Sequence, residues 1–282
     1  MRIQTNTAAA SALGYARVNA QATERSIGRL SSGFRINRAA DDAAGLALAN
    51  KLRADNRALG QAQRNAQQAN SMLQIMDGAT QTVASILDRM KELATQANSA
   101  NSGDQTDKLD AEFKQLVEEI DRIVLTTKYQ GSTLLDGSAT SFKFQVSSSG
   151  QYASNDQITL STTNLELDST TLGVNASTIT GATNTAAQTA AQAALTAIDT
   201  AINTVNKGIG DIGAAQSRVD FASANVATML QNSQAAESTI RDADMAYEMT
   251  QFTKNNILQQ AAQSMLSQAN QGSQGILQLL RG

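Results

Sequence analysis

The sequence of 282 residues contains no cysteine, histidine, proline or tryptophan. These absences exclude disulfide bonds, thiolate nucleophiles, imidazole bases, Ser-His-Asp triads and zinc sites built on Cys or His. Aromatic residues make up only 4% of the chain, so stacking surfaces for bases or cofactors are scarce. Most enzyme mechanisms are therefore excluded, and the sequence indicates no enzyme, no cofactor and no metal site.

Long apolar runs and a strong net charge are also missing. No stretch approaches roughly 18 apolar residues, so no membrane span is expected, and the first residues lack the apolar run of a cleaved signal peptide. The formal net charge of −3 gives no general attraction to nucleic acid. The charge is nevertheless uneven, because residues 1–64 hold 10 Lys and Arg against 4 Asp and Glu, whereas residues 65–210 hold 8 against 15.

Heptad spacing, in which apolar residues recur at alternating steps of three and four, dominates the sequence. One such seam lies between residues 13 and 34, and a second, between 72 and 97, belongs to a helix expected to begin near residue 43. A turn at Asn98–Gly103 and a seam between 109 and 123 follow, then a long seam at 195–230 and an amphipathic segment from about 245 to 280. The pattern predicts a mainly α fold, a long antiparallel coiled-coil or helical-bundle rod built from N- and C-terminal segments.

The middle of the chain has a different composition, since 21 of the 54 residues at 132–185 are Ser or Thr. Apolar and polar residues alternate in Phe142–Val146 and in Ile158–Ser161, which predicts strands of a small central β-hairpin element. A disordered Ser/Thr linker is the alternative, but it gives no reason for the alternating apolar residues.

Three motifs that resemble binding sites have simpler explanations. The glycines of Gly208–Gly213 have the spacing of a dinucleotide fingerprint, but they lie inside a heptad seam and follow a helix rather than a strand. The adjacent carboxylates Asp41-Asp42 and Glu118-Glu119 point apart on a helix, so solvated charge or a helix N-terminus explains them better than a cation site. The basic group near the first seam fits an interface that pairs with acidic neighbours; it consists of Arg25, Arg29, Arg35 and Arg38.

The two terminal arms are amphipathic and have no core of their own. Ordering a residue costs about 1–2 kcal/mol, more than one apolar face returns. We therefore expect the arms to be disordered in a single molecule and to fold against each other and against neighbouring copies on polymerisation. The self-assembly seams that we expect to carry this association contain Leu13, Ile27, Leu30, Phe34, Leu258 and Met265.

Several segments at the two chain ends carry a resemblance to a known family. They are Arg29–Asn37, Ala40–Ala47, Ala236–Ala246, Phe252–Asn255 and Ile257–Ala261. These segments resemble bacterial flagellin, the subunit of the flagellar filament, in a short form without large outer domains. The resemblance implies an inner-tube coiled-coil domain at residues 1–42 and 245–282 and an outer-tube helical domain at 43–131 and 186–244. Residues 132–185 would be the small β-hairpin and Ser/Thr-rich part of that outer domain.

The resemblance also implies a function. The protein is expected to be a structural subunit that self-assembles into the helical filament used for motility, and to reach the outside of the cell without a cleaved signal peptide. Its implied partners are many identical copies, the flagellar export apparatus, a chaperone, the filament cap and the hook-associated proteins. A hook-filament junction protein and a surface adhesin are the alternatives.

A receptor site is implied in the same way. Flagellins that activate Toll-like receptor 5 use an Arg-x-x-Glu-Leu-Ala segment and a Glu on the next helix. The matching residues here are Arg89, Glu92, Leu93 and Glu112. We therefore expect the protein to be a ligand of this receptor. In the simpler alternative, Leu93 only occupies the seam and Arg89 lies in a subunit interface.

Overall fold

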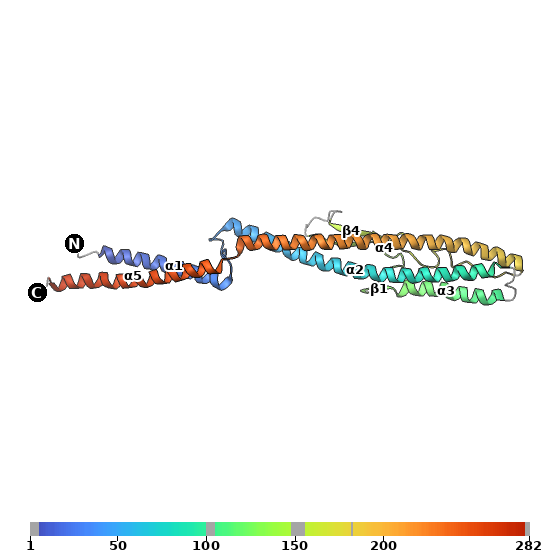
Figure 1. Cartoon of the computed structure of the whole chain (residues 1–282), viewed down its shortest axis with the longest axis horizontal. Helices are drawn as coiled ribbons and strands as arrows, with labels where there is room; N and C mark the ends of the chain where they lie inside the picture. The colour runs from blue at the N-terminus through green and yellow to red at the C-terminus, as the bar shows by residue number, and fades with distance from the viewer. Residues whose placement is uncertain (1–5, 100–104, 148–155, 182, 280–282) are drawn as a thin grey trace. The chain divides into compact units, whose positions relative to one another are not determined.

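The computed structural model describes residues 6–99, 105–147, 156–181 and 183–279. The helices are α1 (Thr7–Ser32), α2 (Ala43–Ala97), α3 (Thr106–Thr126), α4 (Asn184–Arg241) and α5 (Met245–Leu279) (Figure 1). The strands are β1 (Lys128–Tyr129), β2 (Ser132–Thr133), β3 (Ser141–Gln145) and β4 (Gln157–Ser161). The mainly α class is therefore confirmed, as is the helix start near residue 43. Residues 101–103 of the expected turn, and residue 280, lie outside the described residues.

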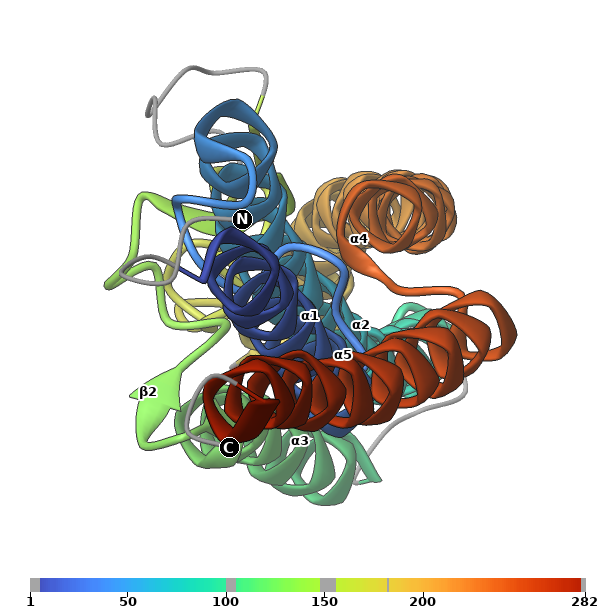
Figure 2. The ribbon, with the colours of Figure 1, turned by 90° about the vertical axis from the view of Figure 1, so that its left-hand side faces the viewer.

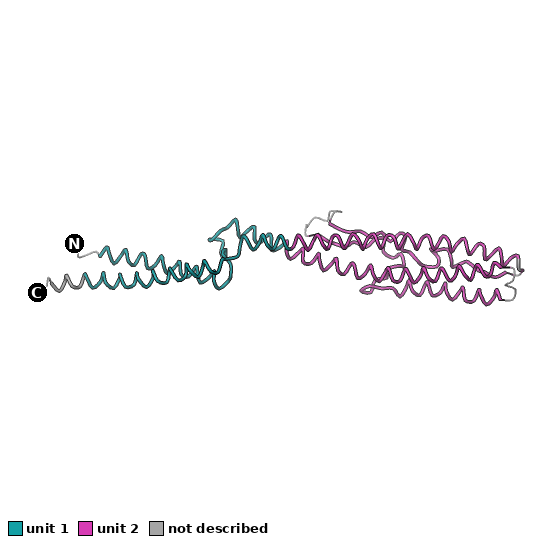
Figure 3. Tube along the Cα trace, in the orientation of Figure 1, with its two compact units in different colours: residues 1–54, 231–282 teal, residues 55–230 magenta. Residues whose placement is uncertain are grey.

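The chain divides into two compact units, coloured separately in Figure 3. Unit 1 consists of residues 1–54 and 231–282, and unit 2 of residues 55–230. The division falls inside α2 and α4, whereas the domain limits inferred from the sequence fall where α2 and α5 begin. The inferred inner-tube and outer-tube domains stay a prediction.

Unit 2 has one large apolar core, to which α2, α3 and α4 each turn their apolar stripe. Every position of the three seams expected in this unit is buried or half-buried in the structure. The fully buried residues include Met76, Val83 and Met90 of α2, Phe113 and Ile120 of α3, and Ile198, Val205 and Ile212 of α4. Burial of such side chains contributes about 1.5–3 kcal/mol each. The apolar seams of unit 2 are therefore covered by other helices of the same chain.

Two short antiparallel hairpins join α3 to the rest of unit 2. The expected one pairs β3 with β4, with Phe142 opposite Leu160 and Phe144 opposite Ile158. The second pairs β1 with β2 and was not predicted from the sequence. Its two turn residues, Gln130 and Gly131, have φ of 49° and 87°, the left-handed conformations that a tight two-residue hairpin needs.

The segment between β4 and α4 is ordered by carboxylates of α3 rather than by regular secondary structure. Asp121 accepts hydrogen bonds from both the amide and the hydroxyl of Ser169, each at 2.8 Å. Asp110 accepts the amide N–H of Ile179 at 3.0 Å. Leu165, Leu167, Val174 and Ile179 are buried beneath these contacts. Residues 156–181 of this Ser/Thr-rich region are therefore packed on the core and do not form a disordered linker.

The glycine motif at residues 208–213 lies within α4, as its seam predicted. Gly208 faces the segment after β4, and a Cβ built on it would stand 2.7 Å from the carbonyl oxygen of Asn164 and 3.1 Å from Leu165 Cδ2. This glycine therefore permits close packing of backbone on helix, and no strand precedes it as a dinucleotide site requires.

In unit 1, α1 packs antiparallel against α5, as the views in Figures 1 and 2 both show. The amide of Asn6 donates to the carbonyl of Ala269 at one end, and Arg29 pairs with Glu248 at 3.6 Å toward the other. The buried and half-buried positions of α1 include a heptad run of mostly small residues: Ala9, Ala12, Ala16, Asn19, Thr23, Ser26 and Leu30. The two helices therefore meet through small side chains. Only Ala16, Thr23 and Leu30 of this run belong to the seam expected from the sequence, which consists of Leu13, Ala16, Ala20, Thr23, Ile27, Leu30 and Phe34.

Candidate functional site

The helices α1 and α5 leave many large apolar side chains exposed. Of the residues expected in the self-assembly seams, Leu13, Ile27, Leu258 and Met265 are 41% to 64% exposed, whereas Leu30 and Phe34 are half-buried. Further large apolar residues are exposed on the same two helices: Tyr15, Val18, Met245, Tyr247, Met249 and Ile257. Large apolar residues exposed in such number on two helices that pack together indicate an interaction site.

The junction between the helices of unit 1 is held by backbone pairing. α1 ends at Ser32 because Gly33 takes a left-handed conformation, with φ of 74°, and donates its N–H to the carbonyl of Arg29. The chain then pairs with the break between α4 and α5. Arg35 donates its N–H to the carbonyl of Arg241 at 2.7 Å, and Ala243 donates to the carbonyl of Gly33 at 2.9 Å.

Two arginine side chains make further contacts across this junction. The guanidinium of Arg35 donates to the carbonyl of Ile240 at 2.8 Å. The guanidinium of Arg241 covers the ring of Phe34 at 3.9 Å from the ring centroid. The Nε and Nη1 atoms of Arg241 are buried and meet no hydrogen-bond acceptor among the described residues. The face of the Phe34 ring therefore provides the attraction that balances part of this charge.

The adjacent carboxylates Asp41 and Asp42 do separate structural work. Asp41 accepts the amide N–H groups of Asn37 at 3.2 Å and Arg38 at 3.0 Å. The hydrogen bond from Arg38 is the main reason that the pKa of Asp41 lies below its ordinary value. Asp42 accepts the amide N–H of Gly45 at 2.9 Å and so begins α2. The expectation that the pair serves a helix N-terminus is therefore confirmed for Asp42.

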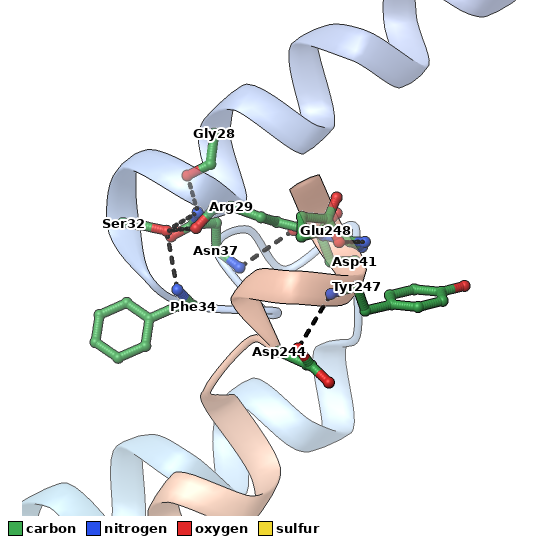
Figure 4. A network of polar contacts seen from close by, with 9 residues as sticks. All are labelled: Gly28, Arg29, Ser32, Phe34, Asn37, Asp41, Asp244, Tyr247 and Glu248. Carbon is green, nitrogen blue, oxygen red and sulfur yellow. Dashed lines mark hydrogen bonds and ion pairs between the residues drawn. The ribbon is translucent and has the colours of Figure 1, made fainter. Parts of the chain in front are cut away.

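A further hydrogen-bond network fixes the loop against the end of α1. The side-chain amide of Asn37 donates to the carbonyl of Gly28 at 3.1 Å and to the hydroxyl of Ser32 at 2.6 Å (Figure 4). On the other side, Asp244 accepts the amide N–H of Tyr247 at 3.1 Å and begins α5. Specific contacts therefore fix both the end of α1 at Ser32 and the start of α5 at Met245.

In unit 2, the structure brings three of the four expected receptor residues together. The Nη2 of Arg89 lies 2.8 Å from Glu112 Oε1 on α3, and its Nη1 lies 2.9 Å from Glu92 Oε2. The hydrogen bond from Glu112, followed by that from Glu92, raises the pKa of Arg89. Leu93, in contrast, is only 1% exposed and lies in the core. The exposed surface around Arg89 is therefore made of charged groups, and Leu93 packs in the core below them.

Other kinds of site are missing from the part of the chain that the structure describes. No group of three or more carboxylates, the side chains here that could hold a metal ion, comes together among those residues. None of their helices has a stretch apolar and long enough to cross a membrane. The outward faces of α1 and α5 are therefore the main candidate site.

Comparison with known proteins gives matches at both ends of the chain. The model of the bacterial flagellin N-terminal helical region matches residues 3–140, and that of the C-terminal helical region matches residues 195–280. The chain is 43% identical to a flagellin of Halalkalibacterium halodurans, with 94% of each chain covered. It is 38% identical to a flagellin of Bacillus subtilis, with 100% of each chain covered.

A solved structure shares the fold. The putative flagellar hook-associated protein from Vibrio parahaemolyticus superposes with a TM-score of 0.57 over 72% of this chain and 100% of that one. Its sequence identity is 15%, so this likeness concerns the architecture of the helices only.

Proposed function

Because the chain belongs to the bacterial flagellin family, whose members are structural subunits of the flagellar filament, we propose that it self-assembles into the helical filament used for motility. The observation that carries the proposal is the apolar face that α1 and α5 leave exposed, with Leu13, Ile27, Leu258 and Met265 on it. Burial of this face against further copies supplies the driving force for polymerisation.

We place the coupling between folding and assembly in the same two helices. Small side chains such as Ala9, Ala12 and Ala16 line the contact of α1 with α5, and each buries little apolar area. Such a pair returns little against about 1–2 kcal/mol of ordering cost per residue. The terminal helices therefore become stable when neighbouring copies cover their outer faces, which is the sense in which they fold on polymerisation.

The proposed domain roles keep the limits inferred from the sequence. Residues 1–42 and 245–282 form the inner tube, and residues 43–131 and 186–244 form the outer tube, with the β-hairpins of 132–185 attached to it. The location is the filament outside the cell, and the partners besides identical copies are the export apparatus, its chaperone, the filament cap and the hook-associated proteins.

Seeded polymerisation followed by electron microscopy and sedimentation tests the proposal. The unaltered protein is expected to give helical filaments, and Leu258→Asp to raise the critical concentration more than tenfold, since a lost Leu contact of about 1.5–3 kcal/mol exceeds the 1.4 kcal/mol of a tenfold change. Leu125→Asp is the matched control, because Leu125 is an exposed leucine of unit 2. Closed oligomers in place of filaments, or equal effects of the two variants, would contradict the proposal.

A second role, as a ligand of Toll-like receptor 5, is favoured by the cluster of Arg89, Glu92 and Glu112. These side chains are held to one another across α2 and α3 and are about half-exposed, so they form a rigid charged surface. Leu93 is assigned a supporting part, because its side chain is in the core.

Cellular receptor assays on unpolymerised protein test this second role. Arg89→Ala is expected to lower potency, whereas Arg122→Ala, which removes a similar exposed ion pair with Glu119 on α3, is expected to leave potency unchanged. Equal potency of the two variants and the unaltered protein would remove Arg89 from the receptor site.

A further inference from the structure

Two cavities flank the second half of α1 in unit 1. One, of about 580 Å³, lies between α1 and the loop that follows it, and its lining includes Gly28 and Arg38. The other, of about 270 Å³, lies between α1 and α5, and its lining includes Val18 and Tyr247. Arg25 and Arg29 line both cavities. The two together are called the Arg25 groove below, defined by Val18, Arg25, Gly28, Arg29, Arg38 and Tyr247.

The groove contains two cations that form no hydrogen bond or ion pair with the described part of the chain. Arg29 is paired with Glu248 at 3.6 Å, and Asp41 accepts the loop amide N–H groups on its Oδ2 and attracts Arg29 and Arg38 electrostatically. The guanidinium groups of Arg25 and Arg38, however, make no hydrogen bond or ion pair with any described residue. Both residues are exposed. The groove therefore offers two charged hydrogen-bond donors to a ligand.

The remaining lining indicates what kind of ligand fits. Glu24 and Asp41 also line the larger cavity, so a small free oxyanion would meet two carboxylates as well as the arginines. Val18 and Tyr247 are 61% and 62% exposed at the smaller cavity and offer apolar area that such an ion cannot use. Exposed aromatic and arginine side chains beside apolar area are typical of the centre of a protein interface.

The charges of the two units indicate which protein surface that is. Unit 1 holds 11 Lys and Arg against 7 Asp and Glu, a net charge of +4, whereas unit 2 holds 11 against 18, a net charge of −7. Among the exposed carboxylates of unit 2, those of Asp88 and Glu118 form no ion pair with a described residue. Opposite charges on two surfaces steer their encounter and set the register of docking.

We propose that the Arg25 groove of one copy is the docking site for the acidic surface of unit 2 of a second copy, meaning the surface around its exposed carboxylates that form no ion pair with a described residue, such as Asp88 and Glu118. The inference rests on the proposed self-assembly and adds which surfaces meet. A contact between unlike surfaces leaves one groove and one acidic surface free at the two ends of any chain of copies. It propagates as an open helix wherever the rotation between copies does not close a ring, whereas a contact between two grooves would close as a dimer.

A single-cysteine variant tests which surface occupies the groove, because the chain has no cysteine of its own. Gly28 lines the larger cavity, and a Cβ built on it meets nothing within 4 Å, so Gly28→Cys fits without rearrangement. The variant is labelled with a maleimide photo-crosslinker, mixed with a ¹⁵N-labelled copy, polymerised and irradiated. Gly14→Cys, also in open space on α1, is the matched control outside the groove.

The expected result is that crosslinks between copies from Gly28→Cys fall in residues 55–230, several-fold more often than those from Gly14→Cys. Crosslinks to residues 1–54 or 231–282 alone would overturn the assignment of unit 2. Failure of the unaltered protein to form filaments would instead overturn the proposed function, so the two failures are distinguishable.

A charge reversal gives an independent measurement. Arg25→Glu is expected to raise the critical concentration for polymerisation about tenfold or more, because it places a fourth carboxylate in the groove beside those of Glu24, Asp41 and Glu248. Arg17→Glu changes the same charge on the same helix outside both cavities and is expected to raise it less than about threefold. Both residues are exposed, so circular dichroism should show unchanged helix content in both variants. Equal effects of the two reversals would overturn the role of Arg25.

Discussion

The guanidinium of Arg241, the last residue of α4, lies 3.9 Å from the centre of the Phe34 ring, which comes two residues after the end of α1. The backbones of Phe34 and Asp242 pair as an isolated antiparallel bridge beside this contact. Residues some 200 positions apart in sequence are therefore joined at the point where both chain arms change direction, so this contact sets how α1 and α5 leave the junction.

Phe34→Leu is expected to weaken this junction while keeping an apolar side chain there. A cation–π contact contributes about 0.5–2 kcal/mol, so amide hydrogen exchange of Arg35 and Ala243, whose N–H groups bond across the junction, should become several-fold faster. Phe144→Leu, in the β3–β4 hairpin of unit 2, is the control and should leave these two amides unchanged. Unaltered exchange in Phe34→Leu would mean that the backbone bonds alone hold the junction.

Gly208→Ala and Gly210→Ala should have opposite effects on the free energy of unfolding. Both gain about 1 kcal/mol of helix propensity. The new methyl at position 208 would stand 2.7 Å from the carbonyl oxygen of Asn164, and such overpacking costs about 1–3 kcal/mol, whereas at position 210 nothing lies within 4 Å. Urea denaturation of unpolymerised protein should therefore place Gly208→Ala below Gly210→Ala by about 1–3 kcal/mol, and equal stabilities would refute the close approach.

Asp121→Asn should loosen the segment between β4 and α4. The carboxylate of Asp121 accepts two hydrogen bonds from Ser169, and a hydrogen bond to a charged group contributes about 1.5–3 kcal/mol, less here because the site is only half-buried and the amide of Asn keeps an oxygen that can accept. We expect a loss of about 1–2 kcal/mol in urea denaturation and faster exchange of the Ser169 amide. Glu118→Gln, on the exposed face of the same helix, should stay within about 0.5 kcal/mol of the unaltered protein.

The helices of unit 2 could be predicted from sequence because their apolar spacing and their burial follow the same period. Met76, Val83 and Met90 lie on the predicted stripe and are fully buried within the chain. The packing of α1 was predicted less well. Apolar spacing predicts that the side chains of Leu13 and Ile27 are buried against another helix, but it does not show whether that helix belongs to the same chain or to another copy. In this chain α5 meets the small residues of α1 instead.

The junction itself could not be predicted from sequence. The pairing of Phe34 with Arg241 and of Gly33 with Ala243 depends on where two distant helix ends meet, and no local period carries that information. Gly33 after the basic end of α1 was the available signal, since a glycine there is typical of a helix C-terminus. The exposed Tyr15, Val18, Tyr247 and Ile257 were missed because they lie off the heptad positions.

The loop after β2 is expected to become less stable in acid, because protonation of Asp136 removes a stabilising carboxylate. The hydroxyl of Thr133, then that of Ser138 at 2.7 Å, donate to its carboxylate and hold its pKa below the ordinary value of 3.8. A carboxyl whose pKa is lower in the folded than in the unfolded chain stabilises the fold above the unfolded pKa. That stabilisation is lost as the pH falls from about 4 through the lowered folded pKa.

Exchange of the Ser138 amide, which donates to Asp136 Oδ1 at 3.1 Å, reports this loss locally. Its protection, corrected for intrinsic exchange, should fall below about pH 4 in the unaltered protein. Thr133→Val removes the main hydrogen bond, so NMR titration of the Asp136 carboxyl should give a pKa closer to the ordinary value. Because the difference between the folded and unfolded pKa is then smaller, the acid-dependent loss of protection should also be smaller. A Thr133→Val variant with the same titration as the unaltered protein would show that the Thr133 hydroxyl does not set this pKa.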